Sequence, residues 1–162
     1  MKIYRLKRTQ FLPITPSAAW EFFSTPKNLA KITPAHMGFQ ILYISGGDKA
    51  YAGQIIEYKV SVLPGIKVIW VTEITHVKEP YHFIDEQRFG PYALWHHQHH
   101  FKEVKGGVEM TDEVNYAIPL GWMGRLAHWI FVGREVNRIF DHRHRVLEEY
   151  FSKSKNGFLK TS

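Results

Sequence analysis

Apolar and polar residues alternate with a period of two through most of the first 118 residues. In the stretch GQIIEYKVSVLPG, for example, Ile56, Tyr58 and Val60 alternate with Glu57 and Lys59. Residues two apart on a strand share one face of a sheet. The alternation, with Gly and Pro turns between the segments, predicts strands over residues 2–12, 37–44, 53–63, 66–77, 81–89, 93–104 and 108–118.

Two other parts of the chain have helical spacing. In TPSAAWEFFS, Thr15 suits an N-cap and Pro16 the first helical position, and PKNLAKI after Pro26 predicts a second short helix. After Pro119, apolar residues recur near every 3.6 positions as far as Phe151. A helix of about 30 residues would be about 45 Å long and would need a wide, curved sheet to pack against.

This order of elements predicts one α+β domain over residues 1–152, with a curved antiparallel meander of six or seven strands, two short helices after the first strand and a long C-terminal helix. The segment 153–162, KSKNGFLKTS, is expected to be a loose tail. A chain of 162 residues, of which 44% are hydrophobic, is long enough for a sizeable core.

Composition excludes several classes of function. The absence of cysteine rules out disulfides, thiol catalysis and thiolate metal sites. The formal net charge of +6 is scattered along the chain without a recognition motif, so no nucleic-acid partner is expected. Neither a signal peptide nor an integral membrane segment is expected, and a cytoplasmic location is predicted.

The alternation also predicts which polar side chains face inward. Asp85 and Gln87 share the predicted inward face of Tyr81, Phe83 and Phe89, and Asp112 lies between inward Met110 and Val114. In the stretch WHHQHH, His97 and His99 lie on the inward face, between Trp95 and Phe101, whereas His96 and His100 point outward.

Turn geometry predicts contacts between these inward groups. In the first hairpin, Asp85 lies opposite His97 if Gln87 lies opposite Trp95. In the second, a hairpin turn at Gly106-Gly107 would place Phe101 opposite Asp112. Asp112 would then be the diagonal neighbour of His99. We therefore expect two inward carboxylate–imidazole pairs, Asp85–His97 and Asp112–His99. Two histidines two apart on a strand are an unspecific metal pattern, and no bound metal or other cofactor is expected.

Several motifs resemble those of a bacterial branch of ligand-binding proteins in the START-like (SRPBCC) superfamily, which includes the Bet v 1 and polyketide cyclase/dehydrase families. They are FxDxQ from Phe83, Gly90-Pro91-Tyr92, WxHxHxF from Trp95, TDxVxY from Thr111, Pro119-Leu120-Gly121 and FDHRH from Phe140. The resemblance implies a helix-grip fold, with a cavity between the sheet and the long helix. It also implies that lipids, sterols, polyketides or other apolar molecules bind in that cavity, and that a minority of members are enzymes.

The predicted function is binding of a small or medium-sized hydrophobic molecule with a polar end. The candidate ligand-binding residues are Tyr58, Trp70, Asp85, Gln87, Trp95, His97, His99, Phe101, Asp112 and Tyr116. One alternative is a cyclase or dehydratase that uses His97 or His99 as general acid or base, although catalysis is not the favoured interpretation. Another is a protein-interaction module whose cavity is filled.

Two features of the long helix are open to more than one interpretation. The DHRHR stretch that includes Arg143 is expected to form a solvated or salt-bridged face. The cluster of Trp122, Met123, Trp129, Ile130 and Phe131 could be a cavity gate, core, or a patch that contacts a membrane or a second copy in a homodimer.

Overall fold

The structure, a computed structural model, describes residues 1–63 and 65–158. Seven strands form one antiparallel sheet in the order β1-β7-β6-β5-β4-β3-β2. All seven segments with period two therefore form strands. Their bounds are β1 Ile3–Leu12, β2 Gln40–Ile44, β3 Gln54–Leu63, β4 Ile66–Lys78, β5 His82–Phe89, β6 Leu94–Val104 and β7 Gly107–Ala117.

The two short helices predicted after the first strand are present. Helix α1 spans Pro16–Phe23, and the Thr15 side chain caps it by accepting a hydrogen bond of 3.2 Å from the Ala18 N–H. The second is the 3₁₀ helix η1 (Pro26–Ile32), followed by a single 3₁₀ turn, η2 (Ala35–Met37). The predicted N-cap is thus confirmed.

The long C-terminal helical region is divided into three parts. Helix α2 (Gly121–Ala127) leads into a π-helical turn, η3 (His128–Val132), and then into α3 (Gly133–Phe158). The helical spacing predicted the region but not the π turn. The backbone of α3 continues to Phe158, within the segment expected to be a loose tail, and residues 159–162 lie outside the described residues.

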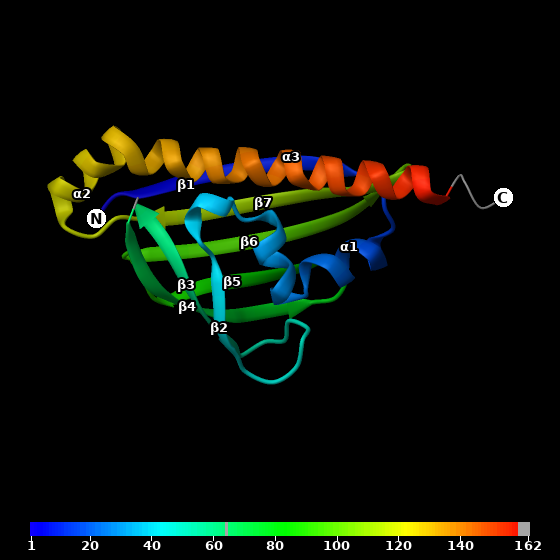
Figure 1. Cartoon of the computed structure of the whole chain (residues 1–162), viewed down its shortest axis with the longest axis horizontal. Helices are drawn as coiled ribbons and strands as arrows, with labels where there is room; N and C mark the ends of the chain where they lie inside the picture. The colour runs from blue at the N-terminus through cyan, green and yellow to red at the C-terminus, as the bar shows by residue number, and fades with distance from the viewer. Residues whose placement is uncertain (64, 159–162) are drawn as a thin grey trace.

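Helix α3 lies across one face of the curved sheet, along β1 and β7 (Figure 1). Its buried side chains share one stripe: Val136, Phe140, Leu147 and Phe151. They pack against inward residues of the sheet and, at one end, against α1. The sheet, α3 and the short helices therefore enclose an interior whose size depends on the side chains that fill it.

The predicted inward faces are confirmed along the middle of the strands. Phe83, Phe101, Met110 and Val114 are buried, as alternation required. Tyr81 and Phe89, also predicted to face inward, are exposed by 58% and 66%. For Phe89 the reason is a shift of register between β4 and β5 at Val71/Thr72, because an extra residue at a bulge reverses the face of those beyond it.

Within the described residues, no helix is both long and apolar enough to cross a membrane.

Candidate functional site

Strands β5 and β6 bring the first polar pair together. Asp85 lies directly opposite His97, as the sequence predicted. Both side chains point to the concave face, with the His97 ring 5.5 Å from that of Phe140 on α3. The neighbouring outward residues, His96 and Gln98, are only half-buried.

Strands β6 and β7 supply the second pair in a different register from the predicted one. His99, not Phe101, lies opposite Asp112. The predicted turn at Gly106-Gly107 is wrong by one residue, because Gly107 already pairs with Val104. This moves the pairing by two positions, which preserves the inward face and turns the predicted diagonal contact into a direct one.

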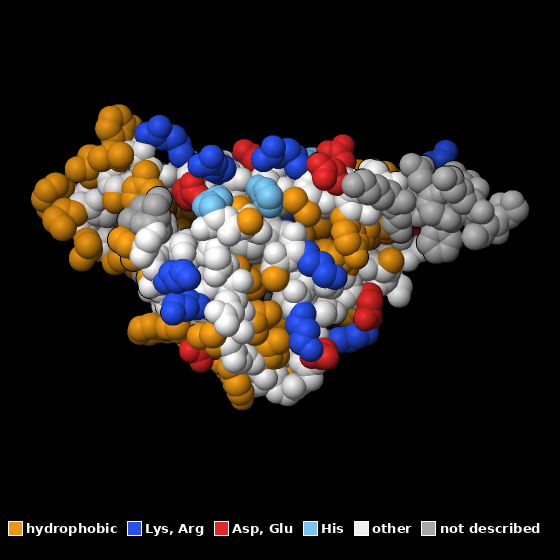
Figure 2. Space-filling view, viewed as in Figure 1, with side chains coloured by type: hydrophobic (Ala, Val, Ile, Leu, Met, Phe, Trp, Pro, Cys, Tyr) orange, Lys and Arg blue, Asp and Glu red, His pale blue; other side chains and the backbone are white. Residues whose placement is uncertain are grey.

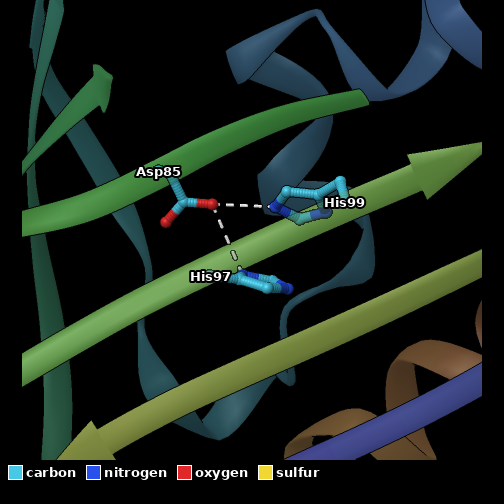
Figure 3. A group of neighbouring side chains, drawn as sticks. All are labelled: Asp85, His97 and His99. Atoms are coloured by element: carbon cyan, nitrogen blue, oxygen red, sulfur yellow. Dashed lines mark hydrogen bonds and ion pairs between the residues drawn. The ribbon is translucent and has the colours of Figure 1, made fainter. Parts of the chain in front are cut away.

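The four side chains form one network rather than two separate pairs. Asp85 Oδ2 lies 2.8 Å from His99 Nε2 and 3.4 Å from His97 Nδ1 (Figure 3). On the other side, Asp112 Oδ1 lies 2.9 Å from His99 Nδ1 and 3.0 Å from His97 Nε2. Each imidazole therefore bridges the two carboxylates, and the predicted pairs exist together with both crossed pairs.

Arg143 completes the network from α3. Its Nη2 lies 3.5 Å from Asp112 Oδ1, and its guanidinium lies 5.7 Å and 5.9 Å from the rings of Phe23 and Phe140. The side chain is only 9% exposed. Of the two expectations for this stretch, a solvated or a salt-bridged face, Arg143 meets the second, and its salt bridge is buried rather than on the surface.

The buried charges determine the protonation of the carboxylates. Burial alone would raise the pKa of Asp112, but Arg143 and hydrogen bonds from His97 and His99 outweigh burial and hold that pKa well below its usual value. At Asp85, burial opposes ionisation in the same way, and His97 and His99 lower the pKa overall. Both carboxyl groups are therefore ionised at neutral pH.

The two imidazoles are shifted in opposite directions. The pKa of His97 is lowered, first by burial and then by repulsion from the neighbouring charge on His99. Burial also disfavours the charged form of His99, but hydrogen bonds to Asp112 and Asp85 outweigh it and raise the pKa of His99. We therefore assign His99 as the imidazolium, which donates to both carboxylates, and His97 as neutral. The two negative charges of Asp85 and Asp112 then balance the two positive charges of His99 and Arg143.

This assignment also explains a close contact between Arg143 and His99. Arg143 Nη2 lies 3.4 Å from His99 Nδ1, which would be a hydrogen bond only if that nitrogen were unprotonated. Because His99 Nδ1 is closer to Asp112 Oδ1, at 2.9 Å, we interpret both nitrogens as donors to the carboxylate.

Asp85, His97 and His99 also have the chemistry to hold a metal ion. One ligand atom from each lies within 4.8 Å of the others, and two imidazoles with one carboxylate suit zinc or iron. With His99 charged as assigned, however, its Nε2–H points to Asp85 Oδ2 at 2.8 Å and takes the position between those two ligand atoms. The charge balance with Arg143 then needs no further cation.

The network lines part of a cavity of about 550 Å³ between the sheet and α3, which is partly open to solvent. The rest of the wall is mainly apolar and aromatic. Strands β3 and β4 contribute Ile56, Val60 and Ile74, and the helical elements contribute Phe23, Leu29, Ile32, Val136 and Phe140. A cavity of this volume is within the range of sites for small organic ligands.

Six of the ten residues predicted to bind a ligand line this cavity: Tyr58, Trp70, Asp85, Trp95, His97 and His99. Tyr58 donates or accepts a hydrogen bond of 3.1 Å with Thr72, and burial raises the pKa of its hydroxyl, so it stays neutral. The aromatic rings of Trp70 and Trp95 meet edge to face at 5.3 Å.

The other four predicted residues do not line the cavity and instead support its wall. Gln87 exchanges hydrogen bonds with the backbone of Tyr92 at 2.7 and 3.1 Å, which fixes the loop between β5 and β6. Phe101 packs on Phe23 and Phe83, and Tyr116 bonds His128 at 2.9 Å. Asp112 lies behind the two histidines and orients them.

Within the described residues, three buried polar atoms of the cavity lining have no hydrogen-bond partner: Ser24 Oγ, Trp70 Nε1 and Arg143 Nε. A buried polar group without a partner costs on the order of 1–3 kcal/mol. Trp70 Nε1 and Arg143 Nε can only donate. All three atoms are covered by neighbouring protein atoms and are not exposed to the open space of the cavity.

Comparisons with known proteins identify the fold and not the ligand. No protein-family model matches the chain, and no curated protein matches its sequence. Among solved structures, Ms6760 from Mycobacterium smegmatis is 16% identical with a TM-score of 0.67, covering 95% of this chain and 98% of that chain. The major latex-like protein 151 from Panax ginseng is 15% identical with a TM-score of 0.65, covering 92% and 97%.

A third similar structure is that of Ara h 8.0201, which is 14% identical with a TM-score of 0.62 and covers 94% of this chain and 99% of that chain. At such identities the likeness concerns the fold alone. These neighbours, together with the seven-stranded antiparallel sheet and the long C-terminal helix, confirm the helix-grip fold that the sequence predicted.

Proposed function

We propose that this chain, which has the Bet v 1-like helix-grip fold, binds a small or medium-sized apolar molecule with an oxygen-containing polar end. The observation that carries the proposal is the cavity of about 550 Å³, apolar over most of its wall and polar at one corner. Burial of a ligand's apolar surface would supply the favourable free energy. The polar corner would fix the direction in which the ligand lies.

The polar side chains of the lining limit the polar end of the ligand. Tyr58 and His97 line the cavity with hydroxyl and imidazole groups that can donate, so a ligand with acceptor oxygens such as a carbonyl or ether fits them. The network is already neutral with His99 and Arg143 charged. A ligand with a full negative charge would leave one buried charge unbalanced unless His97 took up a proton, so a neutral polar end fits best.

The open volume favours a ligand-binding protein over an interaction module with a filled cavity. Side chains of the described residues leave this space unfilled even though protein interiors are normally close-packed. An unfilled apolar space of this size reduces the stability of the fold. A protein that bound no ligand would gain nothing by keeping that space open.

Native mass spectrometry of the untagged protein, purified without metal-affinity resin, tests the proposal. One organic molecule per chain is expected, of a size that the cavity can hold. The adduct should disappear in Val60→Phe, which places a larger side chain in the cavity wall, and remain in Val104→Phe, a residue of β6 that does not line the cavity. An adduct retained equally by both variants would place it elsewhere on the protein.

Acid–base catalysis is a second candidate function, favoured by the two imidazoles that line the cavity in different protonation states. A neutral His97 that donates through Nε2 to Asp112 keeps an unprotonated Nδ1, which could accept a proton from a bound molecule. Both N–H groups of His99 are already donated to carboxylates, so His99 would supply positive charge beside the site. An enzyme would convert the bound molecule, so its mass or its chromatographic retention after incubation with the protein would change, and His97→Gln would stop the change. A binding protein would return the molecule unaltered.

A further inference from the structure

An apolar patch covers the outer side of α2 and η3 at one end of the molecule. Six large apolar side chains there are between 47% and 79% exposed. They form what we term the α2 patch: Leu120, Trp122, Met123, Leu126, Trp129 and Ile130. Figure 2 shows hydrophobic side chains gathered at this end, where Figure 1 places α2.

The inner side of the same segment is firmly attached to the sheet. His128 Nε2 bonds the Tyr116 hydroxyl at 2.9 Å, and the His128 ring stacks on Tyr4 with 3.4 Å between centroids. At Gly124 an added Cβ would lie 2.0 Å from the Pro119 carbonyl oxygen, so this turn of helix sits directly against the preceding backbone. The α2 patch is therefore held outward and cannot turn into the core of its own domain.

The segment that carries the α2 patch is basic, and the next carboxylate along the chain, Glu135, is paired with His36 at 3.0 Å. No Asp or Glu occurs between Val114 and Arg134, whereas Arg125 lies within α2 and is exposed. Lys2 is also close, since it lies 5.1 Å from the ring of Tyr4, which in turn stacks on His128. An apolar surface with tryptophans and a basic border complements an anionic lipid surface.

The α2 patch is continuous with the cavity. Leu120 is 71% exposed and also lines the cavity. Ala127 and Phe131, on the inner side of the same helical segment, line it as well. A surface that contacts α2 from outside therefore lies next to an end of the cavity.

We propose that the α2 patch docks the protein onto anionic lipid bilayers, with Trp122 and Trp129 inserted at the level of the head groups and Arg125 and Lys2 contacting anionic lipid phosphates. A second copy of the chain is a poorer occupant, because a two-fold interface would bring the patch and its basic border against themselves. Docking through the patch does not depend on what the cavity binds, so this proposal is tested independently of the proposed function.

Vesicle co-sedimentation tests the proposal on the full chain. The protein should sediment with vesicles of phosphatidylcholine and phosphatidylglycerol and bind at least about fivefold more weakly to phosphatidylcholine alone, because each basic residue at a charged surface contributes on the order of 1 kcal/mol. The double variant Trp122→Ser/Trp129→Ser should lose about tenfold or more in affinity for the anionic vesicles. Arg125→Gln should weaken binding to anionic vesicles and reduce its dependence on salt.

The matched control is Phe11→Ser/Tyr81→Ser, which removes two aromatic side chains that are 52% and 58% exposed at the end of the sheet opposite α2. Phe11 pairs with Glu109 near the start of β7, and the Tyr81 carbonyl accepts a hydrogen bond from the Phe101 N–H near the end of β6. This control variant should bind vesicles as the wild type does, and circular dichroism should show that both double variants are folded. The proposal would be overturned by equal loss in both double variants or by no binding to anionic vesicles. A concentration-dependent dimer that Trp122→Ser/Trp129→Ser abolishes would assign the α2 patch to a second copy instead.

Discussion

Arg143 shows how a charged residue can belong to the interior of a helix-grip domain. It lies in the same helical stripe as Val136, Phe140 and Leu147, at spacings of seven, three and four residues, and is buried like them. That spacing was visible in the sequence, but the residues next to Arg143 are polar or charged and therefore indicated a solvated or salt-bridged face: Asp141, His142, His144 and Arg145. Only the carboxylate beneath it in β7 explains why the charge is buried.

At the residue scale, Asp112 is the group on which the network depends most. Asp112→Asn should lower the free energy of unfolding by about 3–5 kcal/mol, because it removes the partner of Arg143 and His99 while both stay buried. Urea denaturation measures this loss. The matched control is Glu113→Gln, on the same strand as Asp112, which removes an exposed ion pair of 2.7 Å with Arg5. It should lower the free energy of unfolding by less than about 1 kcal/mol. Equal losses would mean that the network contributes no more than a surface pair.

His99 gives the network a defined pH dependence. Its pKa is raised in the folded state, so its contribution to stability is complete below the unfolded value of about 6.5 and is lost as pH rises through the folded pKa. The difference in unfolding free energy between wild type and His99→Gln should therefore shrink as pH rises above about 6.5. Urea denaturation at several pH values measures it. A difference that stayed constant or grew with pH would contradict the charged assignment of His99.

At the scale of elements, period-two alternation predicted the inward faces better than it predicted the register. A hairpin register that is wrong by two positions leaves every side chain on its own face, so Asp112 and His99 meet despite the error. The bulge between β4 and β5 could not be predicted in this way, because nothing in the alternation marks an extra residue. Phe89 is exposed for that reason.

The turn into α2 is a second element-scale feature, and it depends on close backbone contact. Gly124→Ala would place a Cβ 2.0 Å from the Pro119 carbonyl oxygen, and it should cost about 1–3 kcal/mol as an overpacking change. Thermal or urea denaturation measures the cost. Gly47→Ala has no atom within 4 Å of the added carbon and should change stability by less than about 0.5 kcal/mol. A tolerated Gly124→Ala would show that α2 can move away from Pro119.

At the scale of the whole molecule, the sequence predicted the kind of interior but not its empty volume. Aromatic side chains such as Trp70 and Trp95 can either fill a core or line a cavity. The number of aromatic residues in the sequence therefore cannot distinguish a filled interior from an open one. The volume depends on how far α3 stands from β3 and β4, which is set jointly by all the packed elements. The six predicted residues that line the cavity were found by alternation; Phe23, Val136 and Phe140 were not, because helices contribute them.

The central claim is that this interior accepts an apolar molecule, and titration with the neutral fluorescent probe N-phenyl-1-naphthylamine tests it most directly. The account predicts saturable binding of one probe per chain, about tenfold weaker or more in Val60→Phe and unchanged in Val104→Phe, because only the former reduces the cavity of about 550 Å³. Absence of saturable binding, or binding to Val60→Phe as tight as to the wild type, would contradict the account.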